Sequence, residues 1–97
     1  MPRPPIHPGE ILADELLELG VTPTELARQI KAPANRISEI IRGRRGISAD
    51  TALRLGHWFG TAPQFWLNLQ TAYDLKVAEA ASGRAIGALP RRAGAAV

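Results

Sequence analysis

The chain has 97 residues, 45% of them hydrophobic, with no cysteine and a formal net charge of +3. This length suits one small domain with a compact core and leaves no room for a separate scaffold around a deep catalytic cleft. The missing cysteines exclude disulfides and Cys-based zinc sites, and His7 and His57 stand too far apart in the sequence to suggest a metal site. We therefore expect no cofactor.

No stretch approaches the roughly 18 consecutive apolar residues of a membrane span, and the N-terminus MPRPPIHPGE lacks the apolar core of a secretory signal. A cytoplasmic protein without a membrane partner is the expectation.

The first helical segment should begin between Pro8 and Glu10, after an extended and poorly ordered arm over residues 1–7 that is rich in proline. Apolar residues return at helical spacing, and Gly20 is a suitable stop. These apolar positions are Ile11, Leu12, Leu16 and Leu19. The segment carries four acids and no base, namely Glu10, Asp14, Glu15 and Glu18. Its acidic side is either solvated surface or a face toward a basic partner.

The stretch from Thr22 to Gly43 predicts two short helices joined by a tight turn. Thr22 is placed to cap the first helix, with Pro23 at its first position and Glu25 completing a Thr-x-x-Glu capping box. Apolar spacing then breaks at Lys31 and Ala32, and a second helix is expected over Pro33–Arg42. The arrangement is that of a helix-turn-helix.

The second of these helices has two unlike faces. At about 100° per residue, its three isoleucines share one side and its polar residues the other. The buried set is Ile37, Ile40 and Ile41, and the exposed set is Asn35, Glu39 and Arg42, flanked by Arg36 and Ser38. The polar side is either plain surface or a surface that reads base edges, and the preceding helix, the short turn and the surrounding charge favour reading.

Basic residues concentrate around this helix-turn-helix. Residues 28–45 hold six bases against the single acid Glu39, namely Arg28, Lys31, Arg36, Arg42, Arg44 and Arg45. Lysine and arginine neutralise DNA phosphates and release counterions, so the segment is a plausible phosphate footprint, with ordinary solvated surface as the alternative. Arg44 and Arg45 lie in a loop with Gly46 before Ile47 returns to the core, which suits phosphate contact.

Two further helices complete the predicted fold. Ser48 should cap a helix over Ala49–Phe59 whose buried side includes Leu53, and Thr61 with Gln64 resembles a second capping box that opens a longer helix to about Ala81. That last helix has two apolar rows, Phe65, Leu69, Ala72 and Trp66, Tyr73, Val77. Either both rows are core, or the second row forms a homodimer interface. Residues 82–97 are rich in glycine, alanine and arginine and are expected to be a disordered tail, which leaves 8–81 as the folded domain.

No catalytic constellation is present: the chain has no Gly-rich phosphate loop, no nucleophile paired with a histidine and no acidic pair suited to a cleft. We interpret the chain as a binding module and not an enzyme.

The line HPGEIL, the helix-turn-helix and the run GRRGISADTALRLGHWFGTAPQFWLNLQTAYDL together resemble the HigA-type antitoxins, a VapI-like branch of the Xre/lambda-repressor-like family. The resemblance spans roughly Ile6 to Ala80. It implies an all-α, five-helix lambda-repressor-like domain that binds double-stranded operator DNA as a homodimer and represses its own operon. It also implies a partner toxin, a HigB-type endoribonuclease of the RelE-like class, which the antitoxin holds inactive.

The resemblance places the reading helix at Pro33–Arg42. Its base-reading residues would be Asn35, Arg36, Ser38 and Glu39, and we assign phosphate contacts to Lys31, Arg42, Arg44 and Arg45. Many helix-turn-helix proteins place a glycine where this chain has Lys31. A left-handed lysine would cost roughly 1 to 2 kcal/mol, so a different turn conformation is favoured here.

Two other interpretations of the residues stay open. A stand-alone repressor of the same family would bind DNA without any toxin, and a protein-interaction module would carry its basic segment only as surface. A short toxin gene next to this one would distinguish an antitoxin from a stand-alone repressor. Salt-dependent binding to upstream DNA would exclude a protein-interaction module that does not bind DNA.

Overall fold

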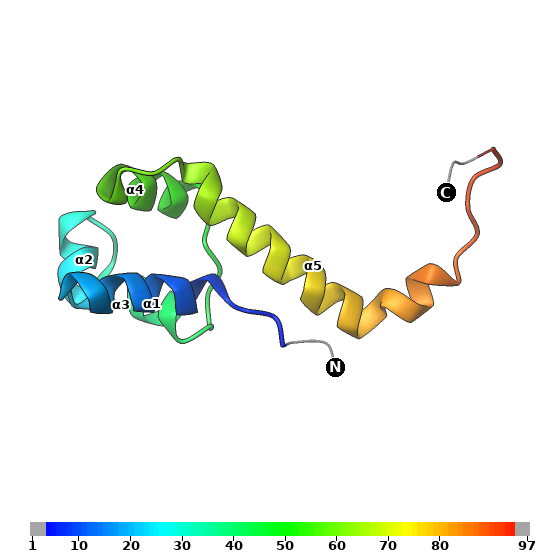
Figure 1. Ribbon diagram of the computed structural model, residues 1–97, viewed down its shortest axis with the longest axis horizontal. Helices are drawn as coiled ribbons and strands as arrows, with labels where there is room; N and C mark the ends of the chain where they lie inside the picture. Colours follow the sequence, from blue (N-terminus) through cyan, green and yellow to red (C-terminus); the bar gives the residue numbers. More distant parts are fainter. Residues whose placement is uncertain (1–3, 95–97) are drawn as a thin grey trace.

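The computed structural model describes residues 4–94, which form five helices and no strand (Figure 1). The helices are α1 (Pro8–Leu19), α2 (Pro23–Gln29), α3 (Ala34–Ile41), α4 (Ala49–Phe59) and α5 (Pro63–Gly87). The predicted all-α, five-helix architecture is confirmed. Residues 1–3 of the expected arm and 95–97 of the expected tail lie outside the described residues.

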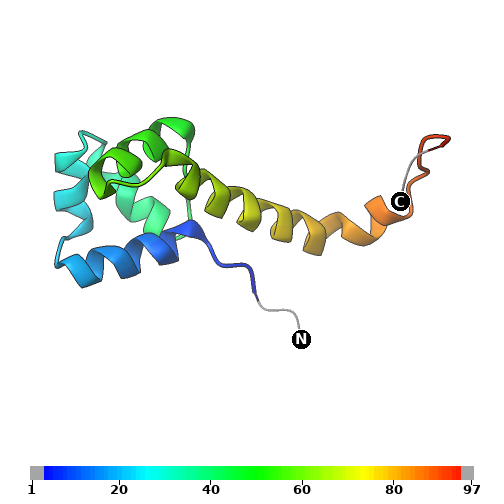
Figure 2. The ribbon, with the colours of Figure 1, turned by 45° about the horizontal axis from the view of Figure 1, so that its top comes forward.

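Helices α1 to α4 and the first half of α5 surround one core (Figures 1 and 2). α2 packs against α3 within the helix-turn-helix, α1 lies across α3, and α4 packs along the start of α5. The core consists of Leu12, Leu16, Leu26, Ala27, Ile30, Ile37, Ile40, Ile47, Ala52, Leu55 and Trp66. Because α3 is packed from two sides, its direction is set by both α1 and α2.

The start of α1 is fixed by His7, which was expected in the arm but is buried instead. Its Nδ1 accepts a hydrogen bond from the Gly9 N–H at 2.9 Å, and its own N–H donates to Glu10 Oε2 at 3.1 Å, a reciprocal capping box. The imidazole also meets the ring of Tyr73 edge-on, with centroids 4.8 Å apart. His7 is therefore a structural cap of α1.

Gly9 marks a close crossing of α1 over α3. A Cβ built on Gly9 would stand 1.9 Å from the Ile40 carbonyl oxygen and 2.9 Å from the Ile41 Cα. Only a residue without a side chain lets the two backbones approach this closely. The HPGE sequence therefore caps α1 and locks it against the end of α3.

Side-chain caps form at two of the three predicted positions, although Glu25 does not complete the box at Thr22 because its carboxylate binds Arg28 and Gln29. Thr22 Oγ1 accepts from the Glu25 N–H at 3.1 Å, and Ser48 Oγ accepts from the Thr51 N–H at 3.3 Å. Thr61 does not cap α5, whose N-cap is Ala62 without a side-chain bond. Its N–H donates to the Gly56 carbonyl at 2.9 Å, so Thr61 completes the end of α4.

Two expected core positions are placed differently in the structure. Leu53 on α4 is 60% exposed, because α4 packs against α5 and bonds to the end of α2 through other residues, Arg54 and Trp58. On α5 the row that faces the domain contains Trp66, while Phe65 in the other row is 46% exposed. The two rows were therefore assigned the wrong way round at this end of the helix.

Trp66 is consequently wrong as a dimer-interface residue. It is 1% exposed and packs with Phe59, with ring centroids 5.3 Å apart. Tyr73 is half-buried against His7. Of the predicted interface residues, Val77 alone is exposed, at 41%.

α5 continues past the predicted end at Ala81 to Gly87, so residues 82–87 are helical and not disordered. Helix propensity does not explain this extension, since residues 82–87 read SGRAIG and include two glycines; adding turns to a helix that is already formed, however, needs no new nucleus. The second half of α5 projects from the domain, and the molecule measures 52 × 27 × 21 Å (Figures 1 and 2). Across residues 4–94, no helix has both the length and the apolar character that a membrane crossing requires.

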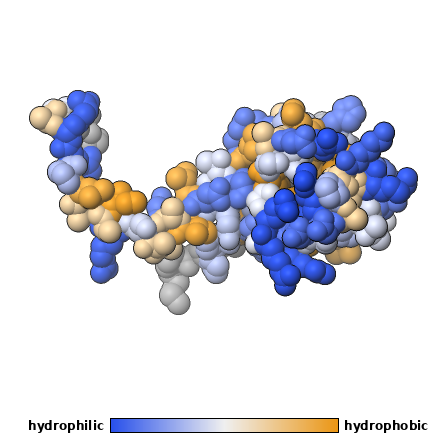
Figure 3. Space-filling model, turned by 180° about the vertical axis from the view of Figure 1, so that it is seen from behind, coloured by the Kyte–Doolittle hydropathy of each residue, from blue (hydrophilic) through white to orange (hydrophobic). Residues whose placement is uncertain are grey.

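Apolar side chains lie exposed along this projecting part, coloured orange in Figure 3. They include Leu75, Val77 and Ile86. Leu75 and Ile86 lie within about 20° of each other around the helix and Val77 about 200° from Leu75, so exposed apolar side chains are present on two different sides of α5.

Candidate nucleic-acid interface

α3 presents its polar side to solvent as its periodicity predicts. Ile37 and Ile40 are completely buried, whereas Asn35 is exposed and Arg36, Ser38 and Glu39 are half-buried. Ser38 Oγ donates to the Asn35 carbonyl at 3.1 Å, so its hydroxyl proton is already engaged and its lone pairs remain for a base donor. The four predicted base-reading residues therefore lie on one short, rigid element.

The phosphate candidates adjoin this helix. Arg42 is the C-cap of α3, and Gly43 follows in the left-handed region with φ 74°. The Gly43 N–H donates to the Ile40 carbonyl at 3.0 Å and the Arg44 N–H to the Glu39 carbonyl at 2.9 Å, the bonds of a Schellman motif. Lys31, Arg42 and Arg44 are exposed and take part in no ion pair among the described residues.

Arg45 differs from the other candidates because it already has a partner. Its Nη2 stands 3.3 Å from Glu39 Oε1, which makes no hydrogen bond in the described part of the chain. The structure thus pairs Arg45, a predicted phosphate-binding residue, with Glu39, a predicted base-reading residue. An Arg45 that turned to a phosphate would leave Glu39 free to accept from a base donor.

The loop of residues 42–46, called the arginine loop below, is anchored by α5. Gln70 Oε1 accepts from the Ile47 N–H at 2.8 Å, and Gln70 Nε2 donates to Asp74 Oδ1 at 2.9 Å. A Cβ on Gly46 would stand 3.1 Å from the Gln70 carboxamide, so the loop lies directly against that side chain. The arginines are thereby held beside α3 by a partly buried hydrogen bond that spans 23 residues of sequence.

The turn between α2 and α3 corrects one prediction. Lys31 adopts the left-handed conformation, with φ 54°, that the sequence disfavours. Its N–H donates to the Arg28 carbonyl at 3.3 Å and the Ala32 N–H to the Ala27 carbonyl at 2.9 Å. These are the bonds that end a helix at a left-handed residue, so the expected helix-turn-helix geometry is kept without a glycine.

An ion pair on α2 perturbs one carboxyl group. Arg28 donates from Nε to Glu25 Oε2 at 3.0 Å and from Nη2 to Glu25 Oε1, and Gln29 Nε2 adds a third bond at 2.9 Å. The hydrogen bond from Arg28, followed by that from Gln29, lowers the pKa of Glu25 from 4.5 to about 2. Because this folded-state pKa is depressed, the pair stabilises the fold above pH 4.5 and its contribution is lost as the pH falls through about 2.

We expect Arg28→Gln to return the pKa of Glu25 toward 4.5, since it removes the largest cause of the shift. Carboxyl-detected NMR titration would measure it, with Gln29→Ala as a control that removes only the smaller cause. The loss of melting temperature in Arg28→Gln should be present at pH 7 and disappear near pH 2. A Glu25 pKa that stays low in Arg28→Gln would contradict this assignment.

The overall shape and sequence match known proteins. The chain is 56% identical over 77 residues to virulence-associated protein I of Dichelobacter nodosus, covering 78% of this chain and 71% of that protein. The solved structure of the Pseudomonas aeruginosa antitoxin HigA with the higBA promoter has a TM-score of 0.87 and 50% identity, over 92% of this chain and 98% of that one.

A Coxiella burnetii addiction module antidote protein of the HigA family gives a TM-score of 0.88 at 51% identity, over 92% of this chain and all of its own. No protein-family model matches the chain. The chain belongs to the HigA family of antitoxins.

For this HigA-family chain, the sequence pattern found the candidate residues on α3 but missed those that position this helix. His7, Gly9 and Gln70 act through contacts with distant segments, and no local spacing reveals those contacts. The HPGEIL line and the run GRRGISADTALRLGHWFGTAPQFWLNLQTAYDL, which contains Gln70, carry the family resemblance, and that resemblance is the signal that could have found these residues. In the described residues no group of three or more His, Asp or Glu side chains could hold a metal ion.

Proposed function

We propose that this chain is a DNA-binding antitoxin that represses its own operon as a dimer and neutralises a HigB/RelE-like mRNA endonuclease. One observation carries the proposal: a polar α3 face and the arginine loop stand side by side, in a fold that matches an antitoxin HigA solved with its promoter. In this interpretation Asn35, Arg36, Ser38 and Glu39 read bases. Lys31, Arg42, Arg44 and Arg45 hold phosphates.

Residues that read bases and residues that bind phosphates should lose DNA affinity in different ways when they are substituted. We expect Asn35→Ala or Arg36→Ala to weaken binding to the DNA upstream of this gene by about 1 to 3 kcal/mol while leaving random DNA nearly unaffected. Arg44→Ala should weaken both, and reduce the slope of log affinity against log salt by about 0.9. Fluorescence anisotropy over a salt series measures both effects. Equal losses on both DNAs for Arg36→Ala would remove it from the reading residues.

The toxin part of the proposal has its own test. Expression of the short gene adjacent to this one should arrest growth, and co-expression of this chain should restore growth and give a complex that co-purifies. A variant with Asn35→Ala and Arg36→Ala should still restore growth, because those side chains are assigned to DNA. If no neighbouring product is toxic and operator binding persists, the chain is a stand-alone repressor instead.

The dimer would form through the side of α5 that carries Val77. Reading two half-sites requires two copies of α3 about one DNA turn apart, ~34 Å, and a two-fold pair is the simplest arrangement that supplies them. Val77 lies in the second half of α5, outside the monomer core, and is exposed. We place Val77 in the interface and Tyr73 at its edge.

A further inference from the structure

The turn that introduces α3 contains the one non-glycine residue with positive φ in the described part of the chain, Lys31 at 54°. In the left-handed region the Cβ of an L-residue crowds the following carbonyl oxygen, so a lysine there is strained where a glycine is not. A strained backbone persists only when its surroundings hold it. The contacts around Lys31 should therefore show what holds it.

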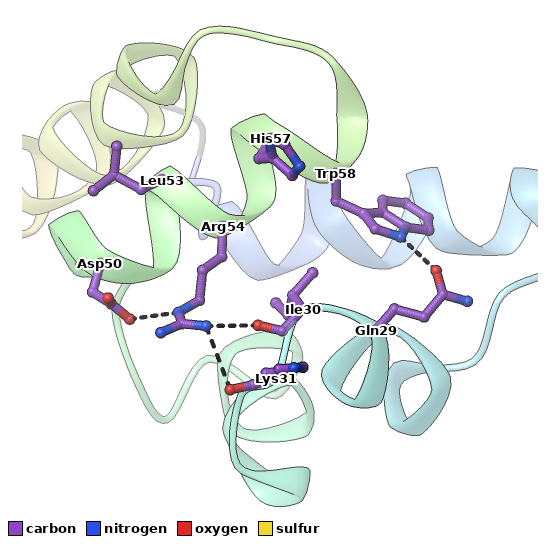
Figure 4. A pocket seen from close by; sticks show the side chains of 8 residues that line it. All are labelled: Gln29, Ile30, Lys31, Asp50, Leu53, Arg54, His57 and Trp58. Atoms are coloured by element: carbon purple, nitrogen blue, oxygen red, sulfur yellow. Dashed lines mark hydrogen bonds and ion pairs between the residues drawn. The ribbon is translucent and has the colours of Figure 1, made fainter.

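One side chain reaches both carbonyls of this turn. Arg54 Nη1 lies 2.8 Å from the Ile30 oxygen and 3.5 Å from the Lys31 oxygen (Figure 4). The Ile30 carbonyl is at the C-cap of α2, where helix carbonyls lack intrahelical partners and the helix dipole is negative. A guanidinium at this point both donates the missing hydrogen bonds and places positive charge where it is favoured.

α4 aims this guanidinium at the turn. Asp50, one helical turn before Arg54, accepts from Arg54 Nε at 2.9 Å and so fixes the plane of the group. Farther along α4, Trp58 Nε1 donates to Gln29 Oε1 at 2.7 Å, again at the end of α2 (Figure 4). Two side chains of α4 thus hold the C-terminal end of α2 from outside the helix-turn-helix.

From these contacts we propose that Arg54 is a positioning residue for DNA reading: it holds the left-handed turn at Lys31 and thereby sets the orientation of α3 relative to α2. The inference rests on the proposed function of α3 as the reading helix. It adds a residue on α4, outside the predicted DNA-contacting set, on which operator recognition depends. It also explains how this chain keeps the turn with a lysine in place of a glycine.

The first test uses the protein without DNA. A residue with positive φ has a short distance between its own amide proton and Hα, which gives a strong intraresidue NOE. Residue 31 should show this NOE in the wild type and lose much of it in Arg54→Met, which keeps the aliphatic stem but removes the donors. In Lys31→Gly/Arg54→Met the turn should persist, seen as wild-type amide shifts for Ala32, Ala34 and Asn35. A full-strength NOE in Arg54→Met would overturn the inference.

The second test is a double-mutant cycle on upstream DNA. At a temperature where every variant is folded by circular dichroism, Arg54→Met should lower operator affinity about tenfold, but only about twofold in a Lys31→Gly background, the coupling expected of residues in contact. Because the effect of Arg54→Met is compared between the wild-type and Lys31→Gly backgrounds, the affinity that a phosphate contact of Lys31 itself contributes drops out of the comparison. Lys76→Met, with the same charge loss on α5, should leave the affinity nearly unchanged.

The salt dependence separates positioning from direct binding of a phosphate. Substitution of a positioning residue leaves the slope of log affinity against log salt unchanged, whereas substitution of a residue that binds a phosphate reduces the slope by about 0.9. Equal losses in both backgrounds together with a reduced slope would make Arg54 a phosphate ligand and refute the inference.

Two further outcomes remain decisive. If Arg54→Met does not fold, Asp50→Ala takes its place in the cycle, with a smaller loss that Lys31→Gly should again diminish; an equal loss in both backgrounds would overturn the inference. If the wild type binds no upstream DNA, the proposed function fails, while the NOE measurement still decides whether Arg54 holds the turn.

Discussion

Gly9→Ala is expected to destabilise the fold by roughly 3 kcal/mol or more, because the new Cβ would stand 1.9 Å from the Ile40 carbonyl oxygen. For a domain of this size that loss corresponds to a fall of about 12 to 24 °C in melting temperature. The clash involves backbone on both sides, so no rotamer change relieves it and α1 must move away from α3. Thermal unfolding followed by circular dichroism measures the effect.

Gly87→Ala is the matched control for this substitution. A Cβ on Gly87 meets nothing within 4 Å, so alanine there should leave the melting temperature unchanged or raise it slightly, as helix propensity predicts. A lower melting temperature for Gly9→Ala and an unchanged or higher one for Gly87→Ala would show that the steric clash, and not helix propensity, decides the effect at Gly9. Equal melting temperatures for wild type and Gly9→Ala would mean that α1 and α3 do not cross as closely as described.

The second large effect is expected from Val77→Glu, which sets a charge into the proposed dimer interface. Val77 is 41% exposed in the second half of α5, so the monomer fold should survive the change. We expect the mass in solution to fall to that of one chain. Operator affinity should fall about 10² to 10⁴-fold because the second half-site is no longer bound intramolecularly. Light scattering and anisotropy measure the two quantities.

Leu75→Glu provides the control for the direction of the interface. Leu75 is 59% exposed and lies two residues earlier, about 200° around the helix, so the same charge is placed on the opposite side of α5. It should remain dimeric. Dissociation of Leu75→Glu with an intact Val77→Glu dimer would place the interface on that other side and exclude Val77 from it. Tyr73→Glu is less informative, since Tyr73 packs on the His7 ring within the monomer.

Features that depend on a few neighbouring residues were predictable from the sequence. The caps at Thr22 and Ser48, the bounds of α4 and the isoleucine side of α3 all follow from spacings of three or four residues, and the structure confirms them. The same periodicity placed the base-reading candidates on the accessible side of α3. The end of α5 was predicted too early: the glycines and the missing apolar period of residues 82–87 indicated disorder, but a helix that is already formed over the preceding residues extends through them.

Contacts between distant segments decided the remainder. Trp66 is core because α5 turns that side toward Phe59, and an apolar row by itself does not reveal which neighbour covers it. His7 is buried because Gly9 lets α1 reach α3, and the arginine loop is held by Gln70. Lys31 becomes left-handed because Arg54, more than twenty residues away, binds the carbonyls of the turn. Local propensity correctly predicts that a left-handed lysine is strained. The hydrogen bonds from Arg54 that compensate for this strain form only when α4 lies beside α2 in the folded domain.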